Sequence, residues 1–436
     1  MALTRVSRWL ALVGLIIIAS LAVKAVAATP RVDVLTVKGA INPVLVDYIS
    51  RGIEQAEDDG AVACIIQMDT PGGLDTAMRD IIQDMVNARV PVVVYVAPSG
   101  SRAASAGAFI TIAAHVAAMA PNTTIGAASP VSIGAEGEAQ MSETMEAKVL
   151  NDAIAYIRSL AESHGRNAEW AEEAVRYAAS ATDQEALELN VIDMVAPNLV
   201  TLVAQLDGWE VTMLDGRQLT ISTQGAEINH VNMRLIEDFL YTISEPNIAY
   251  LLLSLAMLGI LVEVSNPGLI FPGIVGGISL LFAFYSLGML PVNYAGVLLI
   301  VLAFGLFIAE VFTASFGLFT AGGVASLALG SLILFKGGPV FSIDPWLIAT
   351  VVIIFGGLFA FIVRAVVKTH RRQATTGREE LIGQTALAKT ALKPEGTVLL
   401  HGELWKATLE TGRAKPGEEV TVIKVVGLKL QVIKKT

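Results

Sequence analysis

Ser105 is the residue best suited to covalent chemistry, because it stands in the run Ala-Ala-Ser-Ala-Gly after a buried strand predicted over residues 92–96. The small neighbouring side chains leave room for a substrate backbone. A serine at the start of a helix also has its hydroxyl close to the next backbone N–H, here that of Ala106, which is the arrangement of a nucleophile with an oxyanion donor. Small residues at a helix start are equally a common packing device, so the motif alone leaves both interpretations open.

The turn Asp-Thr-Pro-Gly-Gly-Leu at residues 69–74 is the second candidate, placed between a buried strand and a helix. Glycine frees backbone N–H groups at a helix N-terminus, where they can face an anion. The N–H of Gly72 is therefore a candidate for the second donor of an oxyanion hole. A tight strand-to-helix turn that simply requires glycine would look the same.

Lys148 is the third candidate, in a helix predicted over residues 142–163. Apolar residues at positions 145, 149, 153, 156 and 160 predict the buried face of this helix, and Lys148 lies at its border. A lysine acts as a general base only where desolvation lowers its pKa, which a border position beside a closed site would provide. The alternative is a solvated lysine that pairs with Asp152 four residues later.

A catalytic histidine or a bound metal has less support in the sequence than the three candidates above. The histidines at positions 115, 164, 230, 370 and 401 show no H-x-x-x-H or H-E-x-x-H spacing, so we predict no metal site and no cofactor. A Ser-His-Asp triad would need a histidine in the loop after the nucleophile helix, and residues 125–131 contain none. His164 stands at a helix end beside Gly165, where helix termination explains it. Cys64 is the only cysteine, which excludes an intrachain disulfide.

Short apolar runs alternate with amphipathic segments over residues 31–196 and supply a fold that can position these residues. Strands are predicted over residues 32–37, 61–68 and 92–96, and helices over residues 44–57 and 74–87. This alternation is typical of a parallel α/β fold with crossover helices.

Part of the chain must lie in lipid, since 54% of its residues are hydrophobic, only 16% are charged and the mean hydropathy is +0.62. Residues 1–28 have a basic start, an apolar run and the pattern Ala-Val-Ala, which indicates an export signal, with an uncleaved anchor as the alternative. Five further apolar stretches predict about five membrane helices, over residues 248–264, 270–290, 292–313, 316–335 and 346–367.

Charge indicates how the chain is oriented. A basic cluster at residues 364–372 follows the fifth stretch, whereas acidic residues precede the first, so the exported domain and the C-terminus are expected on opposite sides, with the C-terminus in the cytoplasm. The net charge of −10 argues against nucleic-acid binding by the large domain. Residues 381–434 contain five short β-type runs separated by Pro and Gly turns, which predict an OB-like barrel or a similar SH3-like one.

Together, in this order and spacing, the three motifs resemble those of ClpP-like serine proteases, and most closely those of the membrane-bound NfeD family that accompanies stomatin-type proteins. The resemblance covers nearly the whole chain and includes the loop Ile-Gly-Ala-Ala-Ser-Pro at residues 125–130. It implies an α/β spiral domain of the ClpP/crotonase type over residues 29–237, a polytopic α-helical membrane domain over residues 248–367 and a small all-β, OB-like barrel over residues 378–436. In the tail at residues 183–193, Asn190 stands where glycine is usual.

The resemblance also implies a serine endopeptidase with a Ser-Lys dyad. Ser105 would be the nucleophile and Lys148 the base, Gly72 and Ala106 the oxyanion donors, and Gly73 and Phe109 substrate contacts. Small apolar residues around Ser105 predict a cleft for apolar peptide.

The expected substrate is a hydrophobic segment of a stomatin-like membrane protein. The expected form is a homo-oligomer in contact with lipid in the cell inner membrane, with the protease domain periplasmic or extracellular and the barrel cytoplasmic. The alternative function is a non-catalytic membrane scaffold that binds a stomatin-type partner. An acyl-CoA enzyme of the crotonase type shares the spiral fold, but export removes it from CoA.

Overall fold

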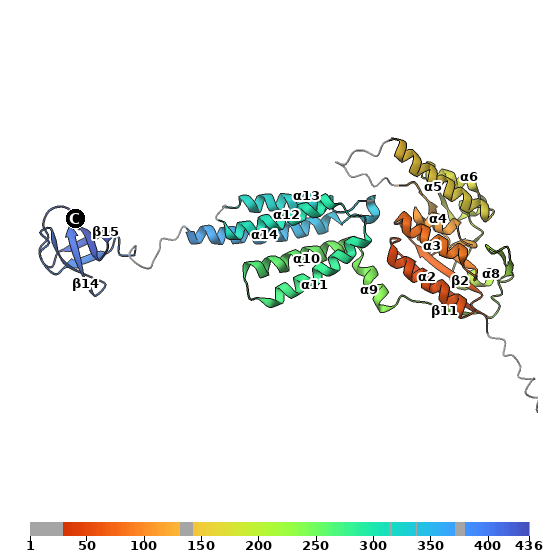
Figure 1. Ribbon diagram of the computed structural model, residues 1–436, viewed down its shortest axis with the longest axis horizontal. Coiled ribbons are helices and arrows are strands. Elements are labelled where there is room, and N and C mark those ends of the chain that lie inside the picture. Colours follow the sequence, from red (N-terminus) through yellow and green to blue (C-terminus); the bar gives the residue numbers. More distant parts are fainter. Residues whose placement is uncertain (1–28, 131–142, 314–315, 337, 371–379, 436) are drawn as a thin grey trace, which may run out of the picture. The chain divides into compact units, whose positions relative to one another are not determined.

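A computed structural model (Figure 1) describes residues 29–130, 143–313, 316–336, 338–370 and 380–435. Its contacts divide the chain into two units, Met1–Ala309 with Ala321–Phe355 and Glu310–Thr320 with Gly356–Thr436. The export signal expected over residues 1–28 lies outside the described residues.

A six-stranded parallel sheet forms the centre of the N-terminal domain, in the order β11-β1-β2-β3-β5-β8. Side chains alternate between its two faces, as the period of a strand requires. Val94 and Val96 pack with helices α2, α3 and α4, while Val93 and Tyr95 pack with α8 and β9 (Glu210–Thr212). The strands are β1 (Arg31–Lys38), β2 (Ala63–Asp69), β3 (Val92–Val96), β5 (Val116–Met119), β8 (Met194–Val195) and β11 (Glu227–His230). The helices on the two faces are α2 (Pro43–Asp58), α3 (Asp75–Asn87), α4 (Ala106–Ile112) and α8 (Leu199–Gln205).

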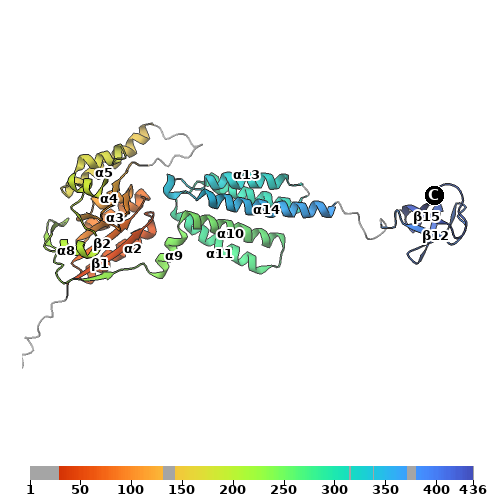
Figure 2. The same ribbon diagram turned by 180° about the vertical axis from the view of Figure 1, so that it is seen from behind.

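A second, three-stranded sheet has the order β4-β6-β7, with β4 and β6 parallel and β6 and β7 antiparallel. Helices α5 and α6 lie side by side in both views of the molecule (Figure 1, Figure 2). This arrangement confirms the expected α/β spiral domain. The elements are β4 (Arg102–Ala104), β6 (Thr124–Gly126), β7 (Ser180–Thr182), α5 (Glu143–Ser163), α6 (Ala168–Arg176), α7 (Asp183–Glu188) and the hairpin β9 (Glu210–Thr212) and β10 (Gln218–Thr220).

Helix α9 (Leu235–Ile243) joins the α/β domain to the membrane domain. Four apolar helices in the described part of the chain are long enough to span a bilayer: α10 (Pro246–Ser265), α11 (Ile270–Met289), α12 (Tyr294–Phe312) and α14 (Pro345–His370). The helix α13 (Leu318–Leu332) is apolar but has only 15 residues. All five occupy the stretches predicted from hydropathy. Glycine allows close packing between them, since a Cβ on Gly259 would lie 2.6 Å from the Cα of Gly276.

The C-terminal segment is a closed barrel in the order β12-β13-β14-β16-β15, with β14 and β16 parallel and the other pairs antiparallel. Val398, Val420 and Leu430 fill its interior and are fully buried. A five-stranded barrel of this non-sequential order favours the OB-like over the SH3-like alternative. Its strands are β12 (Thr385–Ala388), β13 (Glu395–Leu400), β14 (Glu403–Leu409), β15 (Glu419–Val426) and β16 (Lys429–Lys434).

Candidate active site

Ser105 occupies a strained turn between β4 and α4. Its φ of 52° and ψ of −115° lie outside the regions that residues with a Cβ normally adopt. Two backbone hydrogen bonds hold this conformation: Ser105 N–H donates to the Gly126 carbonyl at 3.0 Å, and Ala108 N–H donates to the Ser105 carbonyl at 3.0 Å. The side chain makes no capping bond to the helix. Such strain costs about 1–3 kcal/mol and is found mainly at functional sites.

The Pro-Gly-Gly turn lies directly against this serine. Thr70 pairs with the start of the nucleophile motif, because its N–H donates to the Arg102 carbonyl at 2.8 Å and its carbonyl accepts from Ala104 N–H at 3.1 Å. Gly72 has a φ of +121°, and a Cβ placed on it would lie 2.8 Å from the Ser105 Cβ and 3.3 Å from the Ser105 Oγ. The fold therefore brings together two motifs that are 33 residues apart, counted from residue 72 to residue 105.

The two expected oxyanion donors, the Gly72 and Ala106 amides, differ in whether each already has a hydrogen-bond acceptor. Gly72 N–H donates to the Thr70 Oγ1 at 3.0 Å, and the same hydroxyl lies 3.1 Å from the Gly72 carbonyl oxygen. Ala106 N–H opens α4, and none of the hydrogen bonds found between described residues uses it as a donor. Among the described residues the Ala106 amide thus has no hydrogen-bond acceptor, whereas the Gly72 amide would have to leave a buried hydroxyl to bind an oxyanion.

The residues expected to contact substrate are largely enclosed. Gly73 forms an isolated parallel bridge with Ile41, and a Cβ there would lie 2.1 Å from the Ile41 carbonyl oxygen, so glycine is required for close backbone approach. Phe109 is only 4% exposed, and its ring stacks on that of Tyr156 at 6.1 Å. All seven residues of α4 are buried. The expectation that this apolar segment lines a cleft is therefore wrong: the segment belongs to the core, and the placement of Phe109 does not support a substrate contact.

Lys148 lies in the exposed first turns of α5. The predicted buried face begins only near Ala153, because Met145 and Val149 are 47% and 39% exposed. Asp152 pairs with Arg79 at 2.5 Å, not with Lys148. No hydrogen bond or ion pair joins Lys148 to Ser105 within the described ranges, and residues 131–142, which precede α5, lie outside them. The structure thus brings Ser105, Gly72 and Ala106 together and leaves Lys148 in solvent.

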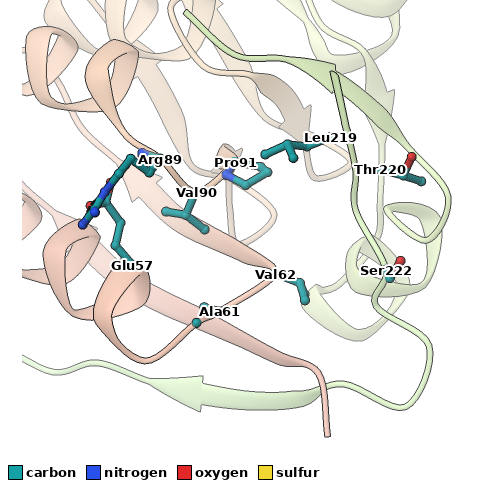
Figure 3. A pocket seen from close by; sticks show the side chains of 10 residues that line it. Glu57, Ala61, Val62, Arg89, Val90, Pro91, Leu219, Thr220 and Ser222 are labelled. Carbon is teal, nitrogen blue, oxygen red and sulfur yellow. Dashed lines mark hydrogen bonds and ion pairs between the residues drawn. The ribbon is translucent and has the colours of Figure 1, made fainter. Parts of the chain in front are cut away.

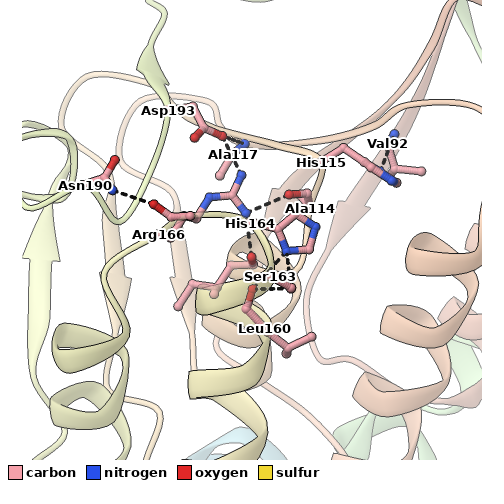
Figure 4. Close-up of polar contacts among 12 residues, drawn as sticks. Val92, Ala114, His115, Ala117, Leu160, Ser163, His164, Arg166, Asn190 and Asp193 are labelled. Carbon is pink, nitrogen blue, oxygen red and sulfur yellow. Dashed lines mark hydrogen bonds and ion pairs between the residues drawn. The ribbon is translucent and has the colours of Figure 1, made fainter. Parts of the chain in front are cut away.

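A buried arginine at the far end of α4 is a feature that the sequence analysis missed (Figure 4). The Arg166 side chain is 2% exposed; its Nη1 donates to the carbonyls of Ile112 at 2.6 Å and Ala114 at 2.7 Å, and its Nη2 pairs with Asp193 at 2.5 Å. A cation at the carbonyl end of a helix satisfies its unpaired acceptors and stabilises its dipole. Arg166 therefore fixes the helix that begins beside Ser105.

Two histidines adjoin this arginine, with ring centroids 6.1 Å apart. His115 Nδ1 accepts a hydrogen bond from Val92 N–H at 3.2 Å. Burial, with the nearby His164 and the Arg166 charge, lowers the pKa of His115 to about 4, and burial also lowers the pKa of His164. Both lie at the C-terminal end of α4, and a helix of seven residues is about 10 Å long. Neither histidine is placed to act as the base for Ser105.

A hollow of about 440 Å³ lies at the opposite edge of the sheet (Figure 3). Val62 and Pro91 line it, and both precede the strands β2 and β3. The Pro-Gly-Gly turn and Ser105 instead come after those strands. In a parallel sheet the two ends of the strands lie at opposite edges, so this hollow is separate from the candidate active site.

Fold and site together define a membrane-anchored α/β protein with a strained serine at the carboxyl edge of its sheet. The chain belongs to the NfeD family. The NfeD1b N-terminal domain matches residues 31–217, the NfeD integral membrane domain matches residues 247–365, and the NfeD-like C-terminal, partner-binding domain matches residues 378–434.

Known relatives cover the whole architecture. The chain is 39% identical over 414 residues to the membrane-bound protease PH1510 of Pyrococcus horikoshii, covering 92% of this chain and 93% of that protein. It is 28% identical over 450 residues to the membrane protein NfeD1b of Bacillus subtilis, covering 97% of each.

Solved structures match the two ends of the chain. One is a lysine-to-alanine mutant of the 1510-N membrane-bound stomatin-specific protease in complex with a substrate peptide. It is 36% identical, covers 50% of this chain and 98% of that chain, and has a TM-score of 0.46. Another is the C-terminal domain of the stomatin operon partner protein 1510-C from Pyrococcus horikoshii, 40% identical, covering 14% of this chain and 97% of that chain, with a TM-score of 0.14.

Proposed function

We propose that this chain is a membrane-bound serine endopeptidase in which Ser105 is the nucleophile and Lys148 the general base. The observation that carries the proposal is the strained Ser105, held against Gly72 with its side chain unused in capping the helix. The relative PH1510 is a membrane-bound protease, and the solved 1510-N membrane protease from Pyrococcus horikoshii is specific for a stomatin homolog. We accordingly propose a stomatin-like membrane protein as the substrate.

The proposed reaction is acyl transfer. The Ser105 hydroxyl attacks the scissile carbonyl and gives its proton to the neutral amine of Lys148. The oxyanion of the tetrahedral intermediate accepts hydrogen bonds from Ala106 N–H and from Gly72 N–H, once the latter has left the Thr70 hydroxyl. Lys148 returns the proton to the leaving amine. Water, deprotonated by the same lysine, then hydrolyses the acyl-enzyme.

Because Lys148 is exposed, its role as a base depends on whether a bound substrate covers it. Met145 and Val149 lie four residues apart on one helix face, beside Lys148, and both are exposed. An apolar peptide segment that covers them would remove the lysine from water, which favours its neutral form. We propose that substrates with several consecutive apolar residues assemble the dyad in this way, and that charged peptides do so poorly.

Replacement of Ser105 by alanine tests the nucleophile. Alanine tolerates the local φ no worse than serine does, so the fold should persist while kcat falls at least ~10³-fold on an apolar peptide. Ser101→Ala, four residues earlier and at a buried serine, is the control and should retain activity. Full peptidase activity in a clean Ser105→Ala preparation would refute the assignment.

A non-catalytic scaffold is the second candidate, favoured by the solvent-exposed position of Lys148 and by the match of the barrel to a partner-binding domain. It predicts that the wild-type chain binds a stomatin-like partner without cleaving it or any apolar peptide. The same assay separates the two functions, because the scaffold gives equal, near-zero rates for the wild-type chain and Ser105→Ala.

A further inference from the structure

Helix α9 carries an uncovered apolar face. Leu235 is 92% exposed, Ile236 59% and Phe239 41%. Glu237 lies on the opposite side of the helix, where it pairs with Arg51, and Asp238 borders the apolar face. Three large apolar side chains on a nine-residue helix are too many to be the scattered single hydrophobics that normal surfaces carry, so this face indicates a binding surface.

The apolar face of α9 continues onto a membrane helix. The Phe239 ring meets the ring of Phe282 in α11 edge-to-face, with centroids 5.3 Å apart. The Ser286 hydroxyl donates to the Ile243 carbonyl at the end of α9. Helix α11 is long and apolar enough to span a bilayer, and Leu281, one residue before Phe282, is 69% exposed. A surface continuous with a lipid-facing helix meets lipid as well.

The opposite side of α9 is fixed to the α/β domain. Arg51 and Glu237 form a two-pronged ion pair with both N···O distances at 2.7 Å and side-chain exposures of 16% and 13%. The Tyr241 hydroxyl donates to the Lys38 carbonyl at 2.7 Å, and a Cβ on Gly39 would lie 2.5 Å from that hydroxyl. The apolar face cannot therefore turn inward without breaking a paired, largely buried charge.

We propose that α9 lies in the headgroup region of the bilayer, with Leu235, Ile236 and Phe239 inserted into its apolar boundary. The partner is a phospholipid surface, and continuity with α11 selects it over a second copy of the chain. An amphipathic helix of this kind is buried about 5–10 Å into the boundary between headgroups and acyl chains. The proposal does not depend on the catalytic roles of Ser105 and Lys148.

The bound helix also supports the turn beside Ser105. Tyr241 holds the end of β1, and Ile41, three residues further along, exchanges backbone hydrogen bonds with the Pro-Gly-Gly turn. Its N–H donates to the Gly72 carbonyl at 2.9 Å, and its carbonyl accepts from Leu74 N–H at 2.9 Å. Helix α9 is thus connected, through Tyr241 and residues 38–41, to the Pro-Gly-Gly turn beside Ser105.

The chain offers a clean background for site-directed labelling. Cys64 is its only cysteine, it is fully buried, and burial raises the pKa of its thiol, so it should stay unlabelled. Leu235→Cys and Ile236→Cys place a nitroxide on the apolar face, and Asp238→Cys places one at its charged, exposed border as the control. The full chain is reconstituted in phospholipid nanodiscs, and accessibility to oxygen, which partitions into hydrocarbon, is compared with accessibility to a water-soluble nickel chelate.

The expected result is an oxygen-to-nickel accessibility ratio several-fold higher at positions 235 and 236 than at position 238. Equal, water-like ratios at all three positions would overturn the proposal. Labels at 235 and 236 that are shielded from both reagents would also overturn it, because they would place a protein surface, such as a second copy of the chain, on this face. Unlabelled Leu235→Ala, with the thermal stability of the wild-type chain, controls for disturbance of the fold.

Discussion

Adding one methyl group at Gly72 should disable the proposed nucleophile while the chain still folds, with a loss of stability that a control variant can match. The Cβ of Gly72→Ala would lie 2.8 Å from the Ser105 Cβ, whereas carbon atoms in contact prefer about 3.5–4.0 Å, so one of them must move by roughly 0.7 Å or more. Backbone hydrogen bonds hold both sides of this contact, from Ile41 to Gly72 and from Ser105 to Gly126. Relief of the clash therefore displaces Ser105, the glycine turn or both, and either shift changes the spacing between the Ser105 hydroxyl and the Gly72 amide. A misplacement of about 1 Å costs roughly 10²-fold in rate. We expect kcat/KM on an apolar peptide to fall about that far.

Gly100→Ala is the control that separates this contact from backbone strain. Gly100 also has a positive φ, +92° against +121° at Gly72, but a Cβ on it would meet no atom within 4 Å. Both variants should lose about 1–3 kcal/mol of stability from strain, visible as similar shifts in thermal unfolding. Only Gly72→Ala should lose activity. If its kcat/KM, measured on folded protein, stays within a few-fold of that of Gly100→Ala, Ser105 is not the reacting group in the geometry described.

Two further changes test the proposed base and the half-buried His115. Lys148→Arg should be as inactive as Lys148→Ala, because arginine cannot give up its proton in a protein; retained peptidase activity in the arginine variant would exclude lysine as the base. The pKa of His115 is lowered from 6.5 to about 4, so its neutral form stabilises the fold above pH 6.5, and roughly 3 kcal/mol should be lost as the pH falls to 4. His115→Gln should flatten the dependence of unfolding temperature on pH in that window, while an unchanged slope would assign the acid sensitivity elsewhere.

The strands could be predicted from the sequence because they depend on local periodicity. The proximity of the Pro-Gly-Gly turn to the Ser105 motif could also be predicted, because both motifs follow strands of one parallel sheet. Residues after β2 and β3 must lie near one another whatever the loops do, so Gly72 and Ser105 were predictable neighbours. The buried face of α5 was only partly predictable. Periodicity shows which face of a helix is apolar, but not how far along that face a neighbour covers it, and Met145 and Val149 have no such cover.

Polar contacts between residues far apart in the chain could not be predicted from the sequence. Arg166 is buried against the carbonyls of Ile112 and Ala114 and against Asp193, yet arginine is among the residues most often exposed. Nothing in the spacing of these residues indicates their encounter. The apolar core around Phe109 was misread as a cleft for a related reason, since small and apolar residues beside a nucleophile suit a binding surface and a packed helix equally well.

The number of membrane crossings decides on which side the C-terminal barrel lies, and it depends on α13. Fifteen residues of helix extend only about 22 Å, less than the ~30 Å of hydrocarbon, so length alone suggests four crossings. The packing of α13 against α12 suggests five. At one end the bridge between Val292 and Phe335 aligns the two segments, and near the other a Cβ on Gly323 would lie 2.6 Å from the Phe307 ring.

Helix α12 is long enough to span the bilayer, and the segment containing α13 runs antiparallel beside most of its length, so both should cross together. Five crossings also agree with the basic residues Arg364 and Lys368 at the end of α14, which favour the cytoplasm. Reporters fused after residue 240 and after Thr436 should therefore report opposite sides of the membrane, the first outside and the second in the cytoplasm. Reporters on the same side would mean that α13 does not cross, despite its alignment with α12.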